Sequence, residues 1–203
     1  MAQCSSTVDE AELLLGGEND NYGGFVIDPC RLPDDPSIFL ERLRRSISRW
    51  KFELKMGIWL KLPTKYAELV PIAIKEGFVY HHAEQDYLML TLWIPESVCT
   101  LPANASHQVG IGALVMNTEN RLLLVQEVTG PTKGSGTWKM PTGVVLQGED
   151  IQDAAVREVK EETGVDAKFV EVFGVRQSHG VAFGKSDLFF VCLLQPLSSC
   201  IVI

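Results

Sequence analysis

The chain has 203 residues, of which 46% are apolar and 22% charged, and its formal net charge at pH 7 is −8. This composition is typical of a soluble globular protein, and the length allows one generous domain or two small ones. An acidic chain lacks the basic surface that unspecific binding to nucleic acid or to an anionic membrane needs, so both partner classes are disfavoured. A polyphosphorylated ligand would have to be held by local groups or by a metal ion.

The amino-terminal region contains no basic residue before Arg31, and its apolar run Leu13–Leu15 is too short for a secretory signal. No apolar run approaches the roughly 20 residues that cross a bilayer. The cysteine count is odd and contains no C-x-x-C pair, which predicts free thiols in a reducing compartment. We therefore expect a cytoplasmic protein. The five cysteines are Cys4, Cys30, Cys99, Cys192 and Cys200.

The first half of the chain predicts a flexible acidic tail over residues 1–22 and a small α/β domain over residues 23–95. Asp35 followed by Pro36 is a helix start signal, and Gly77 is a stop signal. The expected elements of this domain are a strand at 24–27, a helix at 36–50, a strand at 57–62, a helix at 66–76 kinked near Pro71, and strands at 78–82 and 88–94.

Two adjacent histidines, His81 and His82, lie within one of these expected strands. Successive side chains of a strand point to opposite faces, so we expect the two rings to separate and to have structural roles.

The stretch from Pro95 to Asn104 contains two prolines and polar residues and predicts a linker over residues 96–105, and residues 106–203 predict a second domain. A strand at 109–116, a turn at 117–120 and a returning strand at 121–126 are expected to form a hairpin. A loop at 129–136 and an extended segment at 138–141 follow. A helix is expected from Asp150 to Thr163, ended by Gly164, with strands around 169–177 and 188–194.

Three acids on the expected helix, Glu158, Glu161 and Glu162, share one face within a single turn and should repel one another. A solvated acidic face is the ordinary explanation for such a pattern. A separate apolar stripe on the same helix, however, predicts that the acids sit at the edge of a core. Clustered carboxylates are the ligands that Mg²⁺ or Mn²⁺ prefers, so the pattern also predicts a cation site that could hold a diphosphate.

The segment 143–165, GVVLQGEDIQDAAVREVKEETGV, resembles the signature of the Nudix hydrolases, G-x5-E-x7-R-E-U-x-E-E-x-G-U with U aliphatic. All nine specified positions are filled. They are Gly143, Glu149, Arg157, Glu158, Val159, Glu161, Glu162, Gly164 and Val165.

The resemblance implies a Nudix α/β/α sandwich with a mixed sheet, and hydrolysis of nucleoside diphosphate derivatives with Mg²⁺ or Mn²⁺ as cofactor. Carried over by position, Glu158 and Glu162 are expected to be the principal metal ligands, and Glu161 a further ligand or the group that orients water. Arg157 is expected to hold a neighbouring carboxylate, either Glu149 or Glu161. These expectations make Arg157, Glu158, Glu161 and Glu162 the catalytic set. The role of Glu149 stays open between metal ligand and partner of the helix dipole.

A wider resemblance runs through GFVYHHAE at 77–84, LPANASHQVG at 101–110 and RQSHGVAFGKSDLFF at 176–190. These segments are similar to the subgroup with a pre-Nudix domain, above all to plant cytosolic enzymes that act on ADP-ribose and NADH. The resemblance implies AMP and a phosphorylated remainder as products, and a homodimer. Arg176 and His179 are candidates for contacting substrate phosphates or ribose, and structural packing is the alternative for both.

The resemblance ends near residue 197, whereas a Nudix domain normally continues into further strands and a closing helix. The sequence therefore predicts a Nudix domain that is truncated at its carboxyl end. Two functions remain open at this point: a metal-dependent Nudix pyrophosphatase, or a non-catalytic form that binds a nucleotide or a partner.

Overall fold

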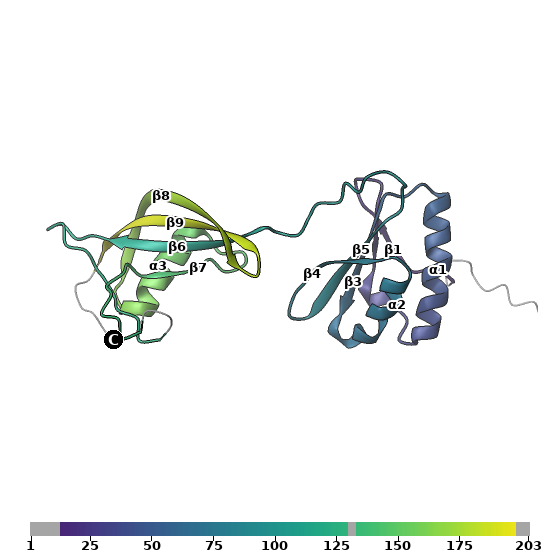
Figure 1. Ribbon diagram of the computed structural model, residues 1–203, viewed down its shortest axis with the longest axis horizontal. Helices are drawn as coiled ribbons and strands as arrows, with labels where there is room; N and C mark the ends of the chain where they lie inside the picture. Colours follow the sequence, from purple (N-terminus) through teal and green to yellow (C-terminus); the bar gives the residue numbers. More distant parts are fainter. Residues whose placement is uncertain (1–12, 130–132, 198–203) are drawn as a thin grey trace, which may run out of the picture. The chain divides into compact units, whose positions relative to one another are not determined.

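A computed structural model describes residues 13–129 and 133–197 (Figure 1). The chain divides into two compact units, and the boundary along the sequence lies between Asn104 and Ala105. Each unit combines helices with a mixed sheet, so the predicted α/β class is confirmed.

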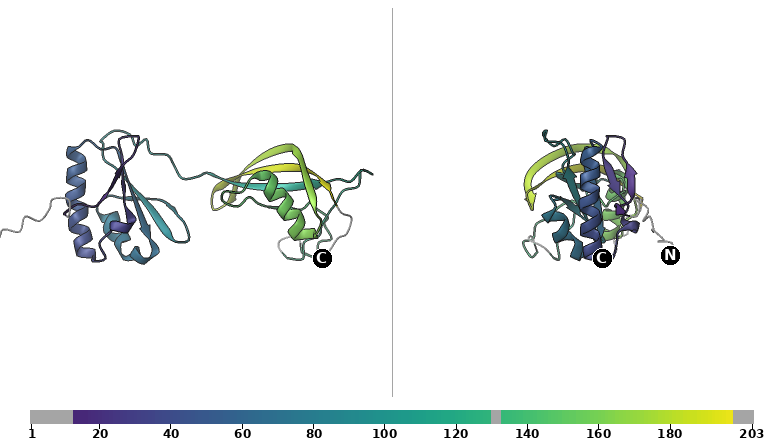
Figure 2. Two further views of the ribbon diagram at one scale, coloured as in Figure 1. Left: turned by 180° about the vertical axis from the view of Figure 1, so that it is seen from behind. Right: turned by 90° about the vertical axis from the view of Figure 1, so that its right-hand side faces the viewer.

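The first unit is built on a five-stranded sheet in the order β1-β2-β3-β5-β4. Strands β2 and β3 are parallel and the other pairs are antiparallel. Two helices and two 3₁₀ turns connect the strands (Figures 1 and 2). Their bounds are β1 Gly17–Asn19, β2 Phe25–Ile27, η2 Pro29–Arg31, α1 Pro36–Phe52, β3 Gly57–Pro63, η3 Thr64–Leu69, α2 Val70–Lys75, β4 Val79–Ala83 and β5 Tyr87–Trp93.

The helices cover one face of this sheet, because alternate residues of each strand bury their side chains against them. In β3, Ile58, Leu60 and Leu62 are fully buried and join Phe39 and Leu43 of α1 in one core. The residues between them, such as Trp59, therefore face the other side of the sheet. That second face carries no helix among the described residues.

Two predictions for this unit are wrong. Residues 13–22, predicted as part of a flexible tail, include β1 and the buried Leu15, whose N–H donates to Ser46 Oγ at 2.9 Å. Residues 1–12 lie outside the described residues. The rings of His81 and His82 meet instead of separating, with 2.7 Å between their Nδ1 atoms. A β-bulge between Tyr80 and His82 breaks the alternation on which the prediction depended.

The second unit has a four-stranded sheet in the order β7-β6-β9-β8, in which β6 runs parallel to β9. Helix α3 packs on one face of it, and Ala155 and Val159 join Ile111 and Leu194 in the core. Within residues 105–129 and 133–197, α3 is the sole helix, so only one of the two helical layers of the implied sandwich is observed. The bounds are β6 His107–Val115, β7 Thr142–Val144, α3 Ile151–Thr163, β8 Ala167–Ala182 and β9 Lys185–Pro196.

The predicted hairpin of residues 109–116 with 121–126 forms only beside its turn, where Met116 and Leu122 make an isolated antiparallel bridge and the N–H of Leu123 donates to Val115 O at 3.0 Å. It does not continue further, because both edges of β6 are taken by β7 and β9. The turn itself is present, and Asn117 Oδ1 accepts hydrogen bonds from the N–H groups of Glu119 and Arg121. Beyond it the chain leaves the sheet, and Val125 forms an isolated bridge with Lys139. This departure from the expected hairpin places residues 125–129 beside α3, where they line a cleft.

Among the described residues, Cys30, Cys99 and Cys192 are free thiols, as predicted, whereas Cys4 and Cys200 lie outside that part of the chain. None of the helices in the described ranges has the length and apolar character that a membrane crossing requires.

Candidate active site

Helix α3 is held at its carboxyl end by Gly164, which adopts φ 69° and whose N–H donates to Lys160 O at 2.9 Å. A left-handed residue at this position is favourable for glycine because it has no Cβ to clash. Ala155, Val159 and Thr163 bury one side of the helix. The acids of the predicted cluster are therefore left on the sides that face away from the core.

Arg157 is the centre of the site, because all five of its guanidinium N–H donors have a partner. Nε and Nη2 form a two-pronged contact with Glu149 at 2.7 and 2.9 Å, and Nη2 also donates to Val144 O at 3.1 Å. Nη1 donates to Glu158 Oε1 at 2.7 Å and to Glu161 Oε2 at 3.2 Å. The sequence left Glu149 and Glu161 as alternative partners of Arg157, and the structure has both.

Both carboxylate oxygens of Glu149 therefore accept hydrogen bonds. Hydrogen bonds from Arg157, followed by one from the N–H of Leu146, lower the pKa of the Glu149 carboxyl to about 2. The same pairing, chiefly with Glu149 and then with Glu158, raises the pKa of Arg157. Glu149 thus stays ionised and fixes the loop before α3 to the helix.

Glu158 lies against the backbone of Gly143, and its side chain is 14% exposed. A Cβ on residue 143 would collide with the Glu158 carboxyl group, so only glycine leaves room for it. Arg157 holds one oxygen of this carboxylate from the other side. The motif glycine and the motif arginine therefore position the same acid.

Replacing Gly143 by Ala should displace the Glu158 carboxylate and lower hydrolytic turnover by at least about tenfold, because a misplaced catalytic group loses rate steeply. Gly174→Ala in β8 is the matched control, since a Cβ there meets no atom within 4 Å. Steady-state kinetics and melting curves of both variants measure the effect. An active Gly143→Ala enzyme with the wild-type melting temperature would contradict this role.

Glu161 and Glu162 line a cleft of about 550 Å³ between α3 and the segment around residues 125–129. The residue Glu162 is exposed as a whole, yet its carboxyl end is partly withdrawn from water. This desolvation raises the pKa of Glu162, and the negative charges of Glu158 and Glu127 add to the rise. The charge of Lys139 and the N–H of Thr142 oppose it. A carboxylate in this position would gain from a nearby cation.

The cleft also contains residues that sequence reasoning did not select, above all Lys139 and Glu127. Their ion pair is 2.6 Å long, and Lys139 Nζ also donates to Thr142 Oγ1 at 3.1 Å. Lys139 is the sole basic residue among the described residues of the lining. Its position four residues before Gly143 was visible in the sequence, but the partner Glu127 follows from the bridge between Val125 and Lys139.

Arg176 and His179 lie on β8 and do not line this cleft. The guanidinium of Arg176 stacks over the ring of Phe189 at 5.3 Å, and His179 Nδ1 is 2.8 Å from Ser186 Oγ. Both contacts join the two strands of the β8–β9 hairpin. The expected contact of these residues with substrate stays a prediction.

No three His, Cys, Asp or Glu side chains converge on one point as a ready-made metal cage within the part of the chain that the structure describes. Glu158 and Glu161 both accept hydrogen bonds from Arg157, whereas the cleft is lined by Glu161 and Glu162. The donor set nevertheless suits Mg²⁺ or Mn²⁺, because such ions commonly use one or two carboxylates together with water and substrate phosphates.

Comparison with known proteins identifies related sequences over both units. A family model for the Nudix hydrolase domain matches residues 15–94, and a model for the NUDIX domain matches residues 106–198. Nudix hydrolase 2 of Arabidopsis thaliana is 55% identical over 190 residues, which cover 94% of this chain and 68% of that protein. Nudix hydrolase 8 of the same plant is 54% identical over 98% of this chain and 54% of that protein.

A human protein, nucleoside diphosphate-linked moiety X motif 6, is 40% identical over 91% of this chain and 60% of its own length. The chain thus spans between about half and two thirds of the curated relatives that it matches.

Proposed function

Because the chain belongs to the Nudix hydrolase family, we propose that it hydrolyses the diphosphate bond of nucleoside diphosphate derivatives at the acids of α3. We propose ADP-ribose, NADH or both as the substrates, cleaved to AMP and a phosphorylated remainder. The observation that carries this proposal is a complete motif of which two acids, Glu161 and Glu162, border a cleft of about 550 Å³.

In this proposal Glu158 and Glu162 are the principal ligands of Mg²⁺ or Mn²⁺. Such a cation, when bound, neutralises charge on the diphosphate oxygens during attack by water. Glu161 is 59% exposed and lines the cleft, so it is placed to be a further ligand or to orient that water.

Arg157 and Glu149 act as positioning residues. Glu149 already accepts hydrogen bonds from Arg157 and from the Leu146 N–H, which favours a structural role over the metal role that the sequence left open. Arg157 in turn orients Glu158. Lys139 offers the cleft a positive charge that an incoming phosphate could share.

A substrate panel tests the proposal. Purified protein is incubated with Mg²⁺ or Mn²⁺ and with ADP-ribose, NADH, FAD, CoA or oxidised nucleotides, and the products are separated by chromatography. We expect metal-dependent formation of AMP together with ribose 5-phosphate from ADP-ribose, or with reduced nicotinamide mononucleotide from NADH, and loss of both activities with excess chelator. A folded protein that forms no product from any substrate would favour the non-catalytic binding form instead.

We also propose a cytoplasmic location, from the amino-terminal region and the cysteine pattern, and a homodimer, which the resemblance implies. Light scattering after size-exclusion chromatography measures the second directly.

A further inference from the structure

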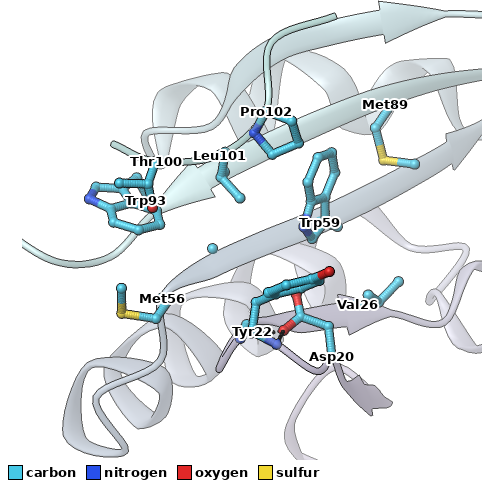
Figure 3. A pocket seen from close by; sticks show the side chains of 12 residues that line it. Asp20, Tyr22, Val26, Met56, Trp59, Met89, Trp93, Thr100, Leu101 and Pro102 are labelled. Atoms are coloured by element: carbon cyan, nitrogen blue, oxygen red, sulfur yellow. Dashed lines mark hydrogen bonds between the residues drawn. The ribbon is translucent and has the colours of Figure 1, made fainter. Parts of the chain in front are cut away.

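The first unit contains a pocket of about 610 Å³ that belongs to none of the groups described above (Figure 3). It lies on the sheet face that the helices leave open. Its floor is formed by Gly24 and Gly57. The two residues lie side by side, so closely that a Cβ on Gly24 would collide with Gly57 O. Because these two residues have no side chains, Asp20 Oδ2 can lie directly over Gly24 and Leu101 directly over Gly57.

Three aromatic rings and two thioethers surround this floor. Trp93 pairs with Gly57 across the β3–β5 ladder, and Trp59 follows two residues further along β3, so the indoles flank the hollow on one face of the sheet. Tyr22 closes the opposite side and is 88% exposed. Exposed aromatic rings arranged around a cavity are typical of a binding site, because their apolar faces are poorly hydrated and gain free energy when a ligand covers them. Met56 and Met89 complete the wall.

Asp20 is the one charged residue among the described residues of the lining. Its Oδ1 accepts hydrogen bonds from the N–H groups of Tyr22 and Gly24, each at 2.7 Å. Its Oδ2 lies over Gly24 at the floor of the pocket, where a Cβ would touch it. Within residues 13–129 and 133–197 no group donates a hydrogen bond to Oδ2. The pocket therefore presents an unused carboxylate oxygen to its contents.

Residues 100–102, part of the predicted linker, form the roof, and the segment 96–102 is fastened to the sheet. Trp93 Nε1 donates to Ser97 O at 2.9 Å, and Leu101 packs directly over Gly57. His81 Nε2 is 2.8 Å from Pro102 O. A carbonyl oxygen can only accept, so this histidine nitrogen is the donor.

That assignment determines the other hydrogen bonds of the histidine pair. In the arrangement with one proton on each ring, His81 accepts at Nδ1 from Nδ1–H of His82, whose Nε2 then accepts from the Tyr87 hydroxyl at 3.1 Å. Each donor in this series of hydrogen bonds, from Tyr87 through the two histidines to Pro102, then has an acceptor. The roof is thus held in place before any ligand arrives, which reduces the entropic cost of binding.

We propose that this pocket binds a small planar aromatic cation of the N-alkylpyridinium class. Indole and phenol faces attract a cation through the ring quadrupole, and the Asp20 carboxylate supplies the opposite charge. No base lines the pocket in the described part of the chain, so phosphate and carboxylate groups would meet only a like charge. The volume lies in the usual range for small-ligand sites. This inference is independent of the proposed hydrolase activity.

Three probes of nearly the same shape test the charge preference. They are 1-methylnicotinamide, a cation, nicotinamide, which is neutral, and nicotinate, an anion, each titrated calorimetrically into the full chain. We expect the cation to bind about tenfold more tightly than the neutral ring, and the anion to bind more weakly than both. Equal affinities for cation and neutral ring, or no binding of the cation at millimolar concentration, would overturn the proposal.

Two variants locate the binding. Asp20→Asn keeps the acceptor for the N–H groups of Tyr22 and Gly24 but removes the charge, so only the advantage of the cation should disappear. Trp59→Leu should weaken both the cation and the neutral ring. Trp138→Leu, an exposed tryptophan of the second unit, should change neither affinity. Wild-type affinity of Asp20→Asn for the cation would refute the assignment, and the three-probe comparison on the wild-type chain decides the question if a variant does not fold.

Discussion

Replacing Glu162 by Gln is expected to lower turnover of a diphosphate substrate by about two to three orders of magnitude, because charge stabilisation at the reacting phosphate depends on this carboxylate. The substitution keeps the size and shape of the side chain, and among the described residues Glu162 forms no hydrogen bond with Arg157. The fold should therefore be unchanged. Initial rates at saturating Mg²⁺ and a melting curve measure both quantities.

Asp153→Asn is the control for this experiment, since Asp153 lies in the first turn of the same helix and is exposed. It removes the same charge from α3 without touching the cleft, and its turnover should stay near that of the wild type. A Glu162→Gln protein that retains wild-type turnover would remove Glu162 from the proposed ligand set.

Arg157→Gln has the second-largest expected effect, because it removes the group that joins the loop before α3, Glu149 and Glu158. We expect turnover to fall by about tenfold to a hundredfold through loss of the Glu158 position. Arg157→Lys should rescue little, since an ammonium cannot reproduce the two-pronged contact with Glu149. Steady-state kinetics at several metal concentrations distinguish two causes. If metal binding is weakened, excess metal restores turnover, and if Glu158 is misplaced, it does not.

The same variant should alter the pH dependence of stability. Arg157 lowers the pKa of Glu149 from 4.5 to about 2. The stabilisation of the fold by the Arg157–Glu149 pair is therefore fully present above pH 4.5 and is lost as the pH falls toward 2. The difference in melting temperature between the wild type and Arg157→Gln should therefore be constant near neutrality and shrink over that window. Arg45→Gln breaks an exposed pair with Glu41 and is the control, with a small effect throughout. A difference that persists unchanged at pH 2 would contradict the pairing.

Features with a local cause could be predicted from the sequence. The helix of the motif begins after Asp150 and ends at Gly164 as expected, because its apolar stripe and its terminal glycine act within a few residues. The contact between Arg157 and Glu161 was expected from the resemblance, and it is also local, since residues four positions apart lie on one face of a helix.

Features set by distant pairing could not be predicted in this way. Lys139 and Glu127 meet because β6 pairs with β9, 79 residues later in the chain, which keeps the intervening segment out of the sheet. Likewise, the approach of His81 to His82 depends on a bulge against β5, and the order of residues 17–19 depends on β2. The sequence pattern of each segment alone carried no sign of its partner.

Binding of Mn²⁺, followed by electron paramagnetic resonance, tests the central claim most directly. Because no three metal-binding side chains converge among the described residues, the cation should need phosphate oxygens as additional ligands. We predict that adenosine 5′-(α,β-methylene)diphosphate strengthens Mn²⁺ binding to the wild type at least about tenfold. This gain should disappear in Glu162→Gln and persist in Asp153→Asn. The same gain in Glu162→Gln as in the wild type would contradict the assignment of the cation site to the acids of α3.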